Sequence, residues 1–307
     1  MEKYSTQKRK YVSLLTSGGF KAVFGDEQNK MVIRDVINTL LQNHRHIVDI
    51  EYMHTEHSQQ GTAPDNKDFR YDFMCRDKEG RFFIVELQRY TDANWFRRCV
   101  SYVARMYNMQ SIKGREYDIP PVYLIALMDT PVRHKDASLP DDRYIFEYSM
   151  YEKISHELLD DTIFIIFAEL CRFNKTWREC RSDLDRMCYL IKNSEEIATE
   201  KPSWMEDNEL LGRLLEACDT DNFDKEKLIK YQKDMYDEAG RLSELNTARA
   251  EGKAEGHAEG KAEGHAEGKA EGKAEERAAI IRKMLQAGMQ EKEIAGILGI
   301  PLEECHP

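Results

Sequence analysis

The order of four segments between residues 69 and 128 limits the fold of this chain more than any other feature. Residues 69–76 and 81–88 are rich in β-forming side chains, and the polar link 77–80, which ends in glycine, predicts a hairpin between them. Residues 94–110 carry apolar side chains at helical spacing, whereas residues 122–128 form an apolar run of strand length. A hairpin, a helix and a buried strand in this order predict an α/β fold with a mixed sheet.

The segments on either side of this core continue the pattern. Residues 20–41 predict an amphipathic helix that is interrupted near Gly25. We predict further strands and then helices with charged outer faces, the strands at 47–53, 144–150 and 162–170 and the helices at 176–193, 204–218 and 224–245. We therefore expect an α/β core over residues 1–175, flanked by helices, and a helical extension over residues 176–248.

From residue 249 to residue 277 the chain repeats Ala-Glu-Gly-Lys and Ala-Glu-Gly-His. Glycine at every fourth position costs a helix about 1 kcal/mol each relative to alanine, and the repeat has no apolar stripe to bury. These residues predict a polar linker that is helical only in part. Residues 278–307 predict a short helical pair that resembles part of a helix-turn-helix, which favours an interaction or homo-oligomerisation element over a complete DNA reader.

Composition excludes several classes of protein. The formal net charge of −11 argues against a uniformly basic nucleic-acid-binding protein. The seven cysteines include no Cys-x-x-Cys pair, so they fit neither a zinc site nor a disulfide framework. No apolar run approaches the ~20 residues of a membrane span. We therefore expect a cytoplasmic protein without a membrane partner.

Two carboxylates face each other in the predicted hairpin. If the hairpin turns about Glu79, Asp72 lies opposite Glu86 to within one residue, and opposed side chains in a sheet have Cβ atoms about 4.5–5.5 Å apart. Two negative charges that close repel each other unless a cation lies between them. Mg²⁺ or Mn²⁺ suits oxygen ligands, and such an ion can activate water and neutralise charge on a phosphate. The pair therefore predicts metal-dependent phosphodiester hydrolysis.

A basic segment follows the second strand of the hairpin. Between residues 89 and 115 there is one acid, Asp92, and there are six basic residues, namely Arg89, Arg97, Arg98, Arg105, Lys113 and Arg115. Arg98 and Arg105 are seven residues apart, so they share one face of the predicted helix. This local excess of positive charge predicts a surface that contacts DNA phosphates. The alternative is a solvated helix face.

Four motifs carry a resemblance to a known family. They are the segment 20–30, Tyr71-Asp72-Phe73, Val85-Glu86-Leu87-Gln88, and Arg98 with Tyr102 four residues later. Together they resemble the PD-(D/E)xK nuclease superfamily and, more narrowly, the recombination-promoting nuclease or transposase family, over residues 20–245. The resemblance implies a restriction-endonuclease-like core, a divalent cation and DNA as the substrate. It also implies that Arg98 and Tyr102 contact phosphate or support the site.

The resemblance further implies which residues act on the metal. Asp72 and Glu86 would be metal ligands, Glu27 would be a third carboxylate, and Gln88 would take the place of the superfamily's lysine. Glutamine can form hydrogen bonds, but it carries no charge and cannot act as a base at neutral pH. If the chain is a nuclease, Gln88→Lys should therefore raise cleavage or change the metal preference.

Two functions follow from these residues. The first is a Mg²⁺-dependent or Mn²⁺-dependent DNA endonuclease that promotes recombination or mobile-element activity, with Asp72, Glu86 and Gln88 as its catalytic residues. The alternative is a catalytically weak or inactive protein of the same fold that acts as a nucleic-acid-binding or assembly module. Gln88 keeps this alternative open, because it replaces the charged residue of the motif.

Overall fold

The computed structural model describes residues 10–42, 46–53, 56–57, 69–111, 118–132, 134, 140 and 142–305. The chain divides into two compact units, Met1–Glu238 and Ala239–Pro307. The first unit holds the sheet and the candidate site. The second holds the repeat and the C-terminal helices.

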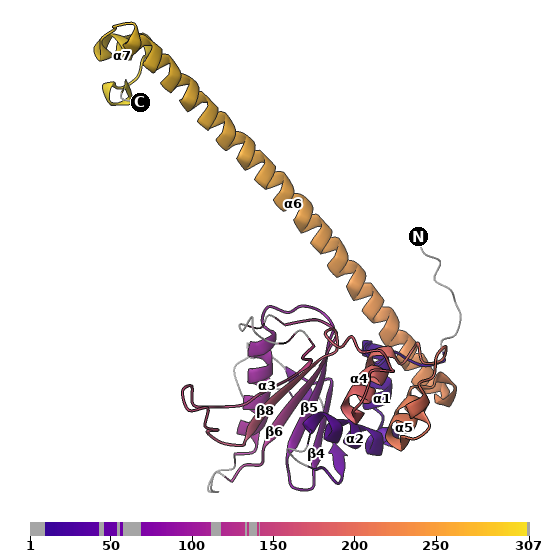
Figure 1. The fold of residues 1–307 in the computed structure, drawn as a ribbon. Coiled ribbons are helices and arrows are strands. Elements are labelled where there is room, and N and C mark those ends of the chain that lie inside the picture. Colours follow the sequence, from indigo (N-terminus) through magenta and orange to yellow (C-terminus); the bar gives the residue numbers. More distant parts are fainter. Residues whose placement is uncertain are drawn as a thin grey trace. The chain divides into compact units, whose positions relative to one another are not determined.

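A six-stranded sheet in the order β1-β4-β5-β6-β8-β7 forms the centre of the first unit (Figure 1). Its strands are β1 (Ile50–Tyr52), β4 (Phe73–Asp77), β5 (Phe82–Gln88), β6 (Val122–Met128), β7 (Ile145–Tyr148) and β8 (Ile163–Glu169). β5, β6 and β8 run parallel to one another, whereas β1, β4 and β7 are antiparallel to their neighbours. Two short strands, β2 (Glu56–His57) and β3 (Phe69–Arg70), pair with each other. The sheet is mixed, as the order of the segments predicts.

Helices cover both faces of this sheet (Figure 1). On one face lies α3 (Trp95–Met109), whose Trp95 and Val103 share a hydrophobic cluster with Ile84 and Leu124 of the strands. The other face carries a second cluster with alternate residues of the same strands, and its helices are α1 (Ser17–Phe24), α2 (Lys30–Leu41), α4 (Asp183–Asn193) and α5 (Glu209–Cys218). This arrangement confirms the predicted α/β restriction-endonuclease-like fold.

The hairpin has the register that its turn predicts. Phe73 pairs with Val85, which is the register of a turn centred on Glu79. Gly80 ends the turn with a φ of 82°, a left-handed conformation that favours glycine. β6 coincides with the predicted buried strand, and every residue in it is buried.

Two predicted helices begin later than expected. The helix predicted from residue 176 begins at Asp183, because Ser182 and Asp185 form a capping box there. The helix predicted from residue 204 begins at Glu209. Three short 3-10 helices complete the unit, namely η1 (Glu27–Asn29), which follows the predicted break at Gly25, η2 (Ser203–Met205) and η3 (Thr220–Asn222).

The helices after β8 belong to the same folded unit as the sheet. Leu190 of α4 and Leu214 of α5 are fully buried in the cluster that contains Phe83 and Ile125 of the strands. These helices complete the core, and the first compact unit extends to Glu238.

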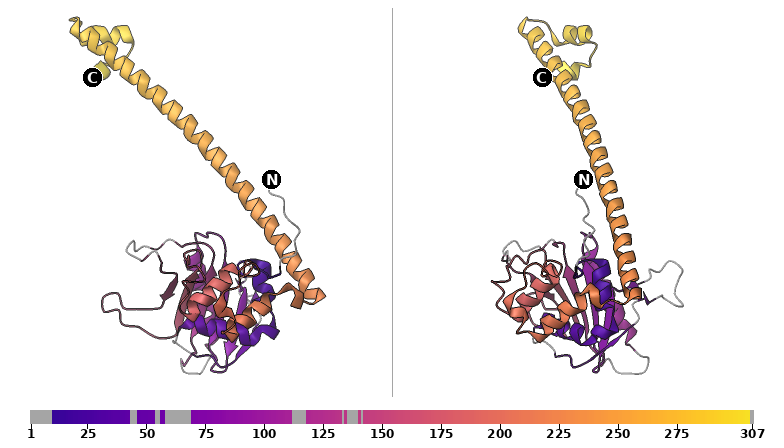
Figure 2. Two further views of the ribbon diagram at one scale, coloured as in Figure 1. Left: turned by 45° about the vertical axis from the view of Figure 1, so that its right-hand side comes forward. Right: turned by 90° about the vertical axis from the view of Figure 1, so that its right-hand side faces the viewer.

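The repeat is helical throughout, in contrast to the partly helical linker that the sequence predicts. α6 extends from Lys225 to Gln286 as one helix of 62 residues, and both views of Figure 2 show it without a break. Alanine, glutamate and lysine favour a helix, and the helical segments on either side remove the cost of nucleation within the repeat. The glycines lower the helix propensity, but they interrupt no packing, since a Cβ at any of them would meet no atom within 4 Å.

A small hydrophobic cluster forms at the C-terminal end of the second unit. After α6 the chain turns at Gly288, whose φ is 85°, into α7 (Glu291–Leu298) and the 3-10 helix η4 (Leu302–Cys305). The buried residues of this cluster are Ile281, Ile294, Ile300 and Cys305. A helical pair is therefore present where the sequence predicts one. Among the described residues, no helix combines the length and the apolar composition needed to span a membrane.

Replacing Gly256, Gly260 and Gly264 together with alanine should stabilise the helical repeat. Each substitution adds about 1 kcal/mol of helix propensity, and no neighbouring atom obstructs the new methyl group. A far-ultraviolet circular dichroism melt of the full chain should show the transition of the repeat at a higher temperature. Gly19→Ala is the opposite control, because its Cβ would lie 1.9 Å from the Ser13 carbonyl oxygen, and it should destabilise the first unit. An unchanged melt of the triple variant would contradict a helical repeat.

Candidate active site

The hairpin brings Asp72 and Glu86 together, as its register predicts. Asp72 immediately precedes β4, and Glu86 lies in β5. The Asp72 backbone N–H donates to Glu86 Oε1 at 3.2 Å, and the Leu87 backbone N–H donates to Asp72 Oδ2 at 2.9 Å. Each carboxylate is thus held by the backbone of the opposite strand segment, so the two groups are neighbours in a fixed geometry.

Burial raises the pKa of both carboxyl groups. Glu86 is only 4% exposed, and burial followed by the negative charge of Asp72 raises its pKa well above the usual range. Loss of hydration around its carboxylate also raises the pKa of Asp72, although the residue as a whole is exposed. The Leu87 N–H and the positive charges of Lys21 and Arg98 oppose that increase. Without a cation, protonation of one carboxyl group relieves the repulsion between the pair.

Gln88 and Arg98 form a hydrogen-bonded pair beside the carboxylates. The buried Gln88 amide donates through Nε2 to the Tyr90 carbonyl oxygen and accepts through Oε1 from Arg98 Nη2 at 2.9 Å. Arg98 Nη1 donates to Asp92 Oδ2 at 2.8 Å, and the guanidinium lies 4.6 Å from the centre of the Trp95 ring. Both ends of the glutamine side chain are therefore engaged, and Arg98 is held in one position.

Tyr102 and Arg105 lie further along α3, near Tyr71. The Tyr102 ring meets the Tyr71 ring edge to face at 4.9 Å. Burial, followed by the negative charge of Glu86, raises the pKa of Tyr102 to about 12. Tyr102 therefore keeps its proton at neutral pH, so it can donate a hydrogen bond but cannot act as a base. Arg105 is half-buried, and its charge acts on Tyr71.

The other predicted basic residues lie in different surroundings. Arg97 is exposed on α3. Arg89 forms an ion pair with the buried Glu238 of α6, which also accepts a hydrogen bond from the Ser17 backbone N–H at 3.0 Å. Lys113 and Arg115 lie outside the described residues.

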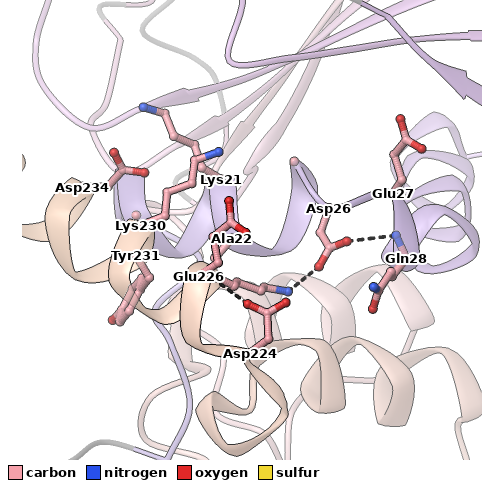
Figure 3. A pocket seen from close by; sticks show the side chains of 13 residues that line it. Lys21, Ala22, Asp26, Glu27, Gln28, Asp224, Glu226, Lys230, Tyr231 and Asp234 are labelled. Carbon is pink, nitrogen blue, oxygen red and sulfur yellow. Dashed lines mark hydrogen bonds and ion pairs between the residues drawn. The ribbon is translucent and has the colours of Figure 1, made fainter.

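Glu27 lies at a cavity that Asp72 and Glu86 do not line. It is exposed at the start of η1 and lines a cavity of about 270 Å³. Figure 3 shows Glu27 at one end of this cavity and Lys21 and Lys230 at the other. Within the part of the chain that the structure describes, no three His, Cys, Asp or Glu side chains come together as a metal site. The structure therefore does not join Glu27 to Asp72 and Glu86 in one cluster.

The chemistry of Asp72 and Glu86 fits a hard divalent cation. Both donors are carboxylate oxygens, and Mg²⁺ is typically bound by one or two carboxylates together with water and phosphate oxygens. A cation would also remove the repulsion that raises the pKa of Glu86. The pair can thus hold a metal without a third carboxylate.

Sequence analysis did not identify Lys21 or Glu238 as parts of this region. Lys21 lies on α1, and its charge acts on Asp72. Glu238 and Arg89 are 149 residues apart in the chain. No spacing rule connects residues on different elements at such separations, so only the packed structure shows these contacts.

A comparison with known families matches residues 16–248 to the PD-(D/E)XK nuclease family transposase. The matched residues run from α1 through the sheet into α6 and include both hairpin carboxylates. Comparisons with curated proteins and with solved structures give no match. Since the family match covers most of the chain, the protein belongs to the PD-(D/E)XK nuclease family of transposases.

Proposed function

We propose that the protein is a Mg²⁺-dependent or Mn²⁺-dependent DNA endonuclease whose cuts promote recombination or mobile-element activity. The observation that carries this proposal is the adjacent pair Asp72 and Glu86, held by reciprocal backbone hydrogen bonds near the carboxyl end of β5. A fixed pair of carboxylates with one member buried is costly unless it serves a cation. Membership of a nuclease family makes phosphodiester hydrolysis the reaction that this site supports best.

Each residue of the site would have its own role in hydrolysis. Asp72 and Glu86 would hold the metal, which when bound supplies an activated water and neutralises charge on the phosphate. Arg98, fixed by Gln88 and Asp92, presents a positive charge beside the carboxylates and can bind a phosphate oxygen. Gln88 acts as a positioning residue through Arg98. Unlike a lysine, it supplies neither a base nor a positive charge.

The DNA would lie along the basic side of α3. Arg97 is exposed there, and Arg98, Tyr102 and Arg105 lie on the same helix nearer the hairpin. Arg89 can contribute a phosphate contact only if its ion pair with Glu238 opens. We place the reaction in the reducing cytoplasm, where the seven free cysteines would remain unpaired.

Cleavage of supercoiled plasmid by the purified chain tests this proposal. Wild-type protein should cut with Mg²⁺ or Mn²⁺ and not with EDTA, and Asp72→Asn should reduce the rate by roughly a hundredfold or more, because a neutral amide is a poor ligand for a hard cation. Glu51→Gln, which alters an exposed carboxylate on β1, should cut like the wild type.

Gln88 favours a second candidate, a DNA-binding or assembly module without nuclease activity, since no lysine follows Glu86 in the motif. Folded wild-type protein that shifts DNA but leaves it intact with every metal would support this module and overturn the nuclease. Cleavage in EDTA, or cleavage by Asp72→Asn at the wild-type rate, would also overturn the metal mechanism.

A further inference from the structure

A cavity of about 700 Å³ opens next to the candidate site, at the carboxyl ends of the parallel strands β5 and β6. Gln88 and Asp92, which fix Arg98, both line it. In α/β sheets, ligands bind in crevices outside the carboxyl ends of the strands. The volume is in the range of cavities that hold small organic groups. We call it the aromatic cavity, because Tyr90, Trp95 and Phe96 form part of its wall.

The aromatic wall offers flat surfaces for stacking. Phe96 is 42% exposed and Tyr90 is 37% exposed, whereas Trp95 is almost fully buried. Phe96 is supported from behind by Phe167, with ring centres 5.7 Å apart, and by Tyr148, which meets it edge to face at 6.4 Å. Exposed aromatic rings held in place by packing are the platforms on which proteins stack nucleic-acid bases.

Polar atoms are also present in the aromatic cavity. The hydroxyl groups of Thr91 and Thr130 lie 3.2 Å apart in the lining. These groups can donate to or accept from the edge of a polar ring.

The charge of the lining favours the base of a nucleotide over its phosphate. The described lining contains Asp92 and His134, but no lysine or arginine. A backbone phosphate would therefore find no permanent cation here, whereas a neutral base would find stacking surfaces and hydrogen-bonding groups. Arg98, which donates to Gln88 and Asp92 but does not line the cavity, can bind the phosphate instead.

We propose that the aromatic cavity binds one unpaired nucleobase of the DNA strand whose phosphate lies at Asp72 and Glu86. The inference rests on the proposed nuclease function and names its substrate class. A base inside a duplex has both faces stacked and its pairing edge occupied, so only a single-stranded or extruded base can enter a cavity. The protein should accordingly prefer single-stranded, gapped or mismatched DNA over perfect duplex.

Binding of two oligomers by the full chain tests this inference without requiring cleavage. The Glu86→Gln protein in EDTA is titrated with labelled oligothymidine and with an abasic oligomer of the same length. Oligothymidine should bind about tenfold more tightly, because stacking on an aromatic side chain strengthens binding of each base. Phe96→Ala added to this protein should remove most of that difference and leave affinity for the abasic oligomer unchanged.

Two further variants make the result specific. Trp95→Phe keeps a ring in the wall at a residue that is only 2% exposed, so it should weaken oligothymidine binding less than Phe96→Ala does. Val100→Ala changes an exposed residue one turn along α3 that does not line the cavity, and it should change neither affinity. Circular dichroism confirms that each variant is folded.

The outcomes separate this inference from the nuclease proposal. Equal affinity of the parent protein for the two oligomers, an equal loss for both in Phe96→Ala, or no binding of either oligomer would overturn the base cavity. Base-dependent binding in a protein that cuts no plasmid would uphold the cavity and reject the nuclease. Cleavage of plasmid without base-dependent binding would uphold the nuclease and reject the base cavity.

Discussion

Glu86→Gln should abolish metal-dependent cleavage and, in the same protein, stabilise the metal-free fold at neutral pH. The loss of rate should be about a thousandfold or more, because metal-assisted stabilisation of transition-state charge amounts to several kcal/mol. The gain in stability follows from burial, since Glu86 is 4% exposed and adjacent to Asp72. A glutamine fits the same space without a negative charge.

The sign of the pH dependence follows from the direction of the pKa shift. Burial and the charge of Asp72 raise the pKa of Glu86 in the folded protein above its unfolded value of about 4.3. The folded state therefore binds more protons than the unfolded state between these two pKa values, and the free energy of unfolding decreases as pH rises through that interval. Below the unfolded value both states are protonated, so the destabilisation is absent there.

Thermal melts of wild type and Glu86→Gln in EDTA measure this effect across the acidic to neutral range. The wild-type melting temperature should lie below that of Glu86→Gln at neutral pH, and the difference should shrink as pH falls toward about 4.3. Mg²⁺ should raise the melting temperature of the wild type and leave that of the variant unchanged. Glu51→Gln, with its exposed carboxylate, serves as the control. A variant that is less stable than the wild type at neutral pH would show that the Glu86 charge is already compensated in the free protein.

The hairpin and its carboxylate pair were predictable because local rules fix them. A short turn sets the register of an antiparallel pair, so the position of Glu79 determines that Asp72 and Glu86 meet. The same holds for β6, whose apolar run of strand length is typical of a buried strand. Short-range geometry was sufficient in both cases.

The rest of the site depends on contacts between elements that sequence spacing cannot supply. Arg98 was expected to face phosphate, but its bond to Gln88 depends on how α3 crosses the sheet. Glu27 was predicted as a third carboxylate only from the resemblance of residues 20–30 to the family, and the structure places it at a cavity that Asp72 and Glu86 do not line. Arg89 meets Glu238 only because the first part of α6, which belongs to the first unit, packs beside the end of β5.

Gln88→Lys should lower both cleavage and stability, the opposite of what the motif alone suggests. A lysine at this position removes the acceptor for Arg98 Nη2 and places an ammonium group beside a guanidinium. The glutamine side chain is buried, so the lost hydrogen bond should cost about 1–3 kcal/mol of unfolding free energy. Displacement of Arg98 should lower the cleavage rate by about tenfold to a hundredfold, because one charge-assisted phosphate contact is lost.

A double variant shows whether Arg98 is the cause. In Gln88→Lys with Arg98→Gln, the two positive charges no longer meet and the new glutamine can accept from the lysine, so stability should recover toward that of the wild type. Gln88→Glu is the companion variant, since it keeps an acceptor for Arg98 but loses the donor to the Tyr90 carbonyl oxygen, so it should lower stability without bringing two positive charges together. Urea unfolding and plasmid cleavage of the set separate the two effects. If Gln88→Lys instead cleaves faster at unchanged stability, Arg98 is free to move aside, and position 88 can take the lysine that the superfamily motif carries.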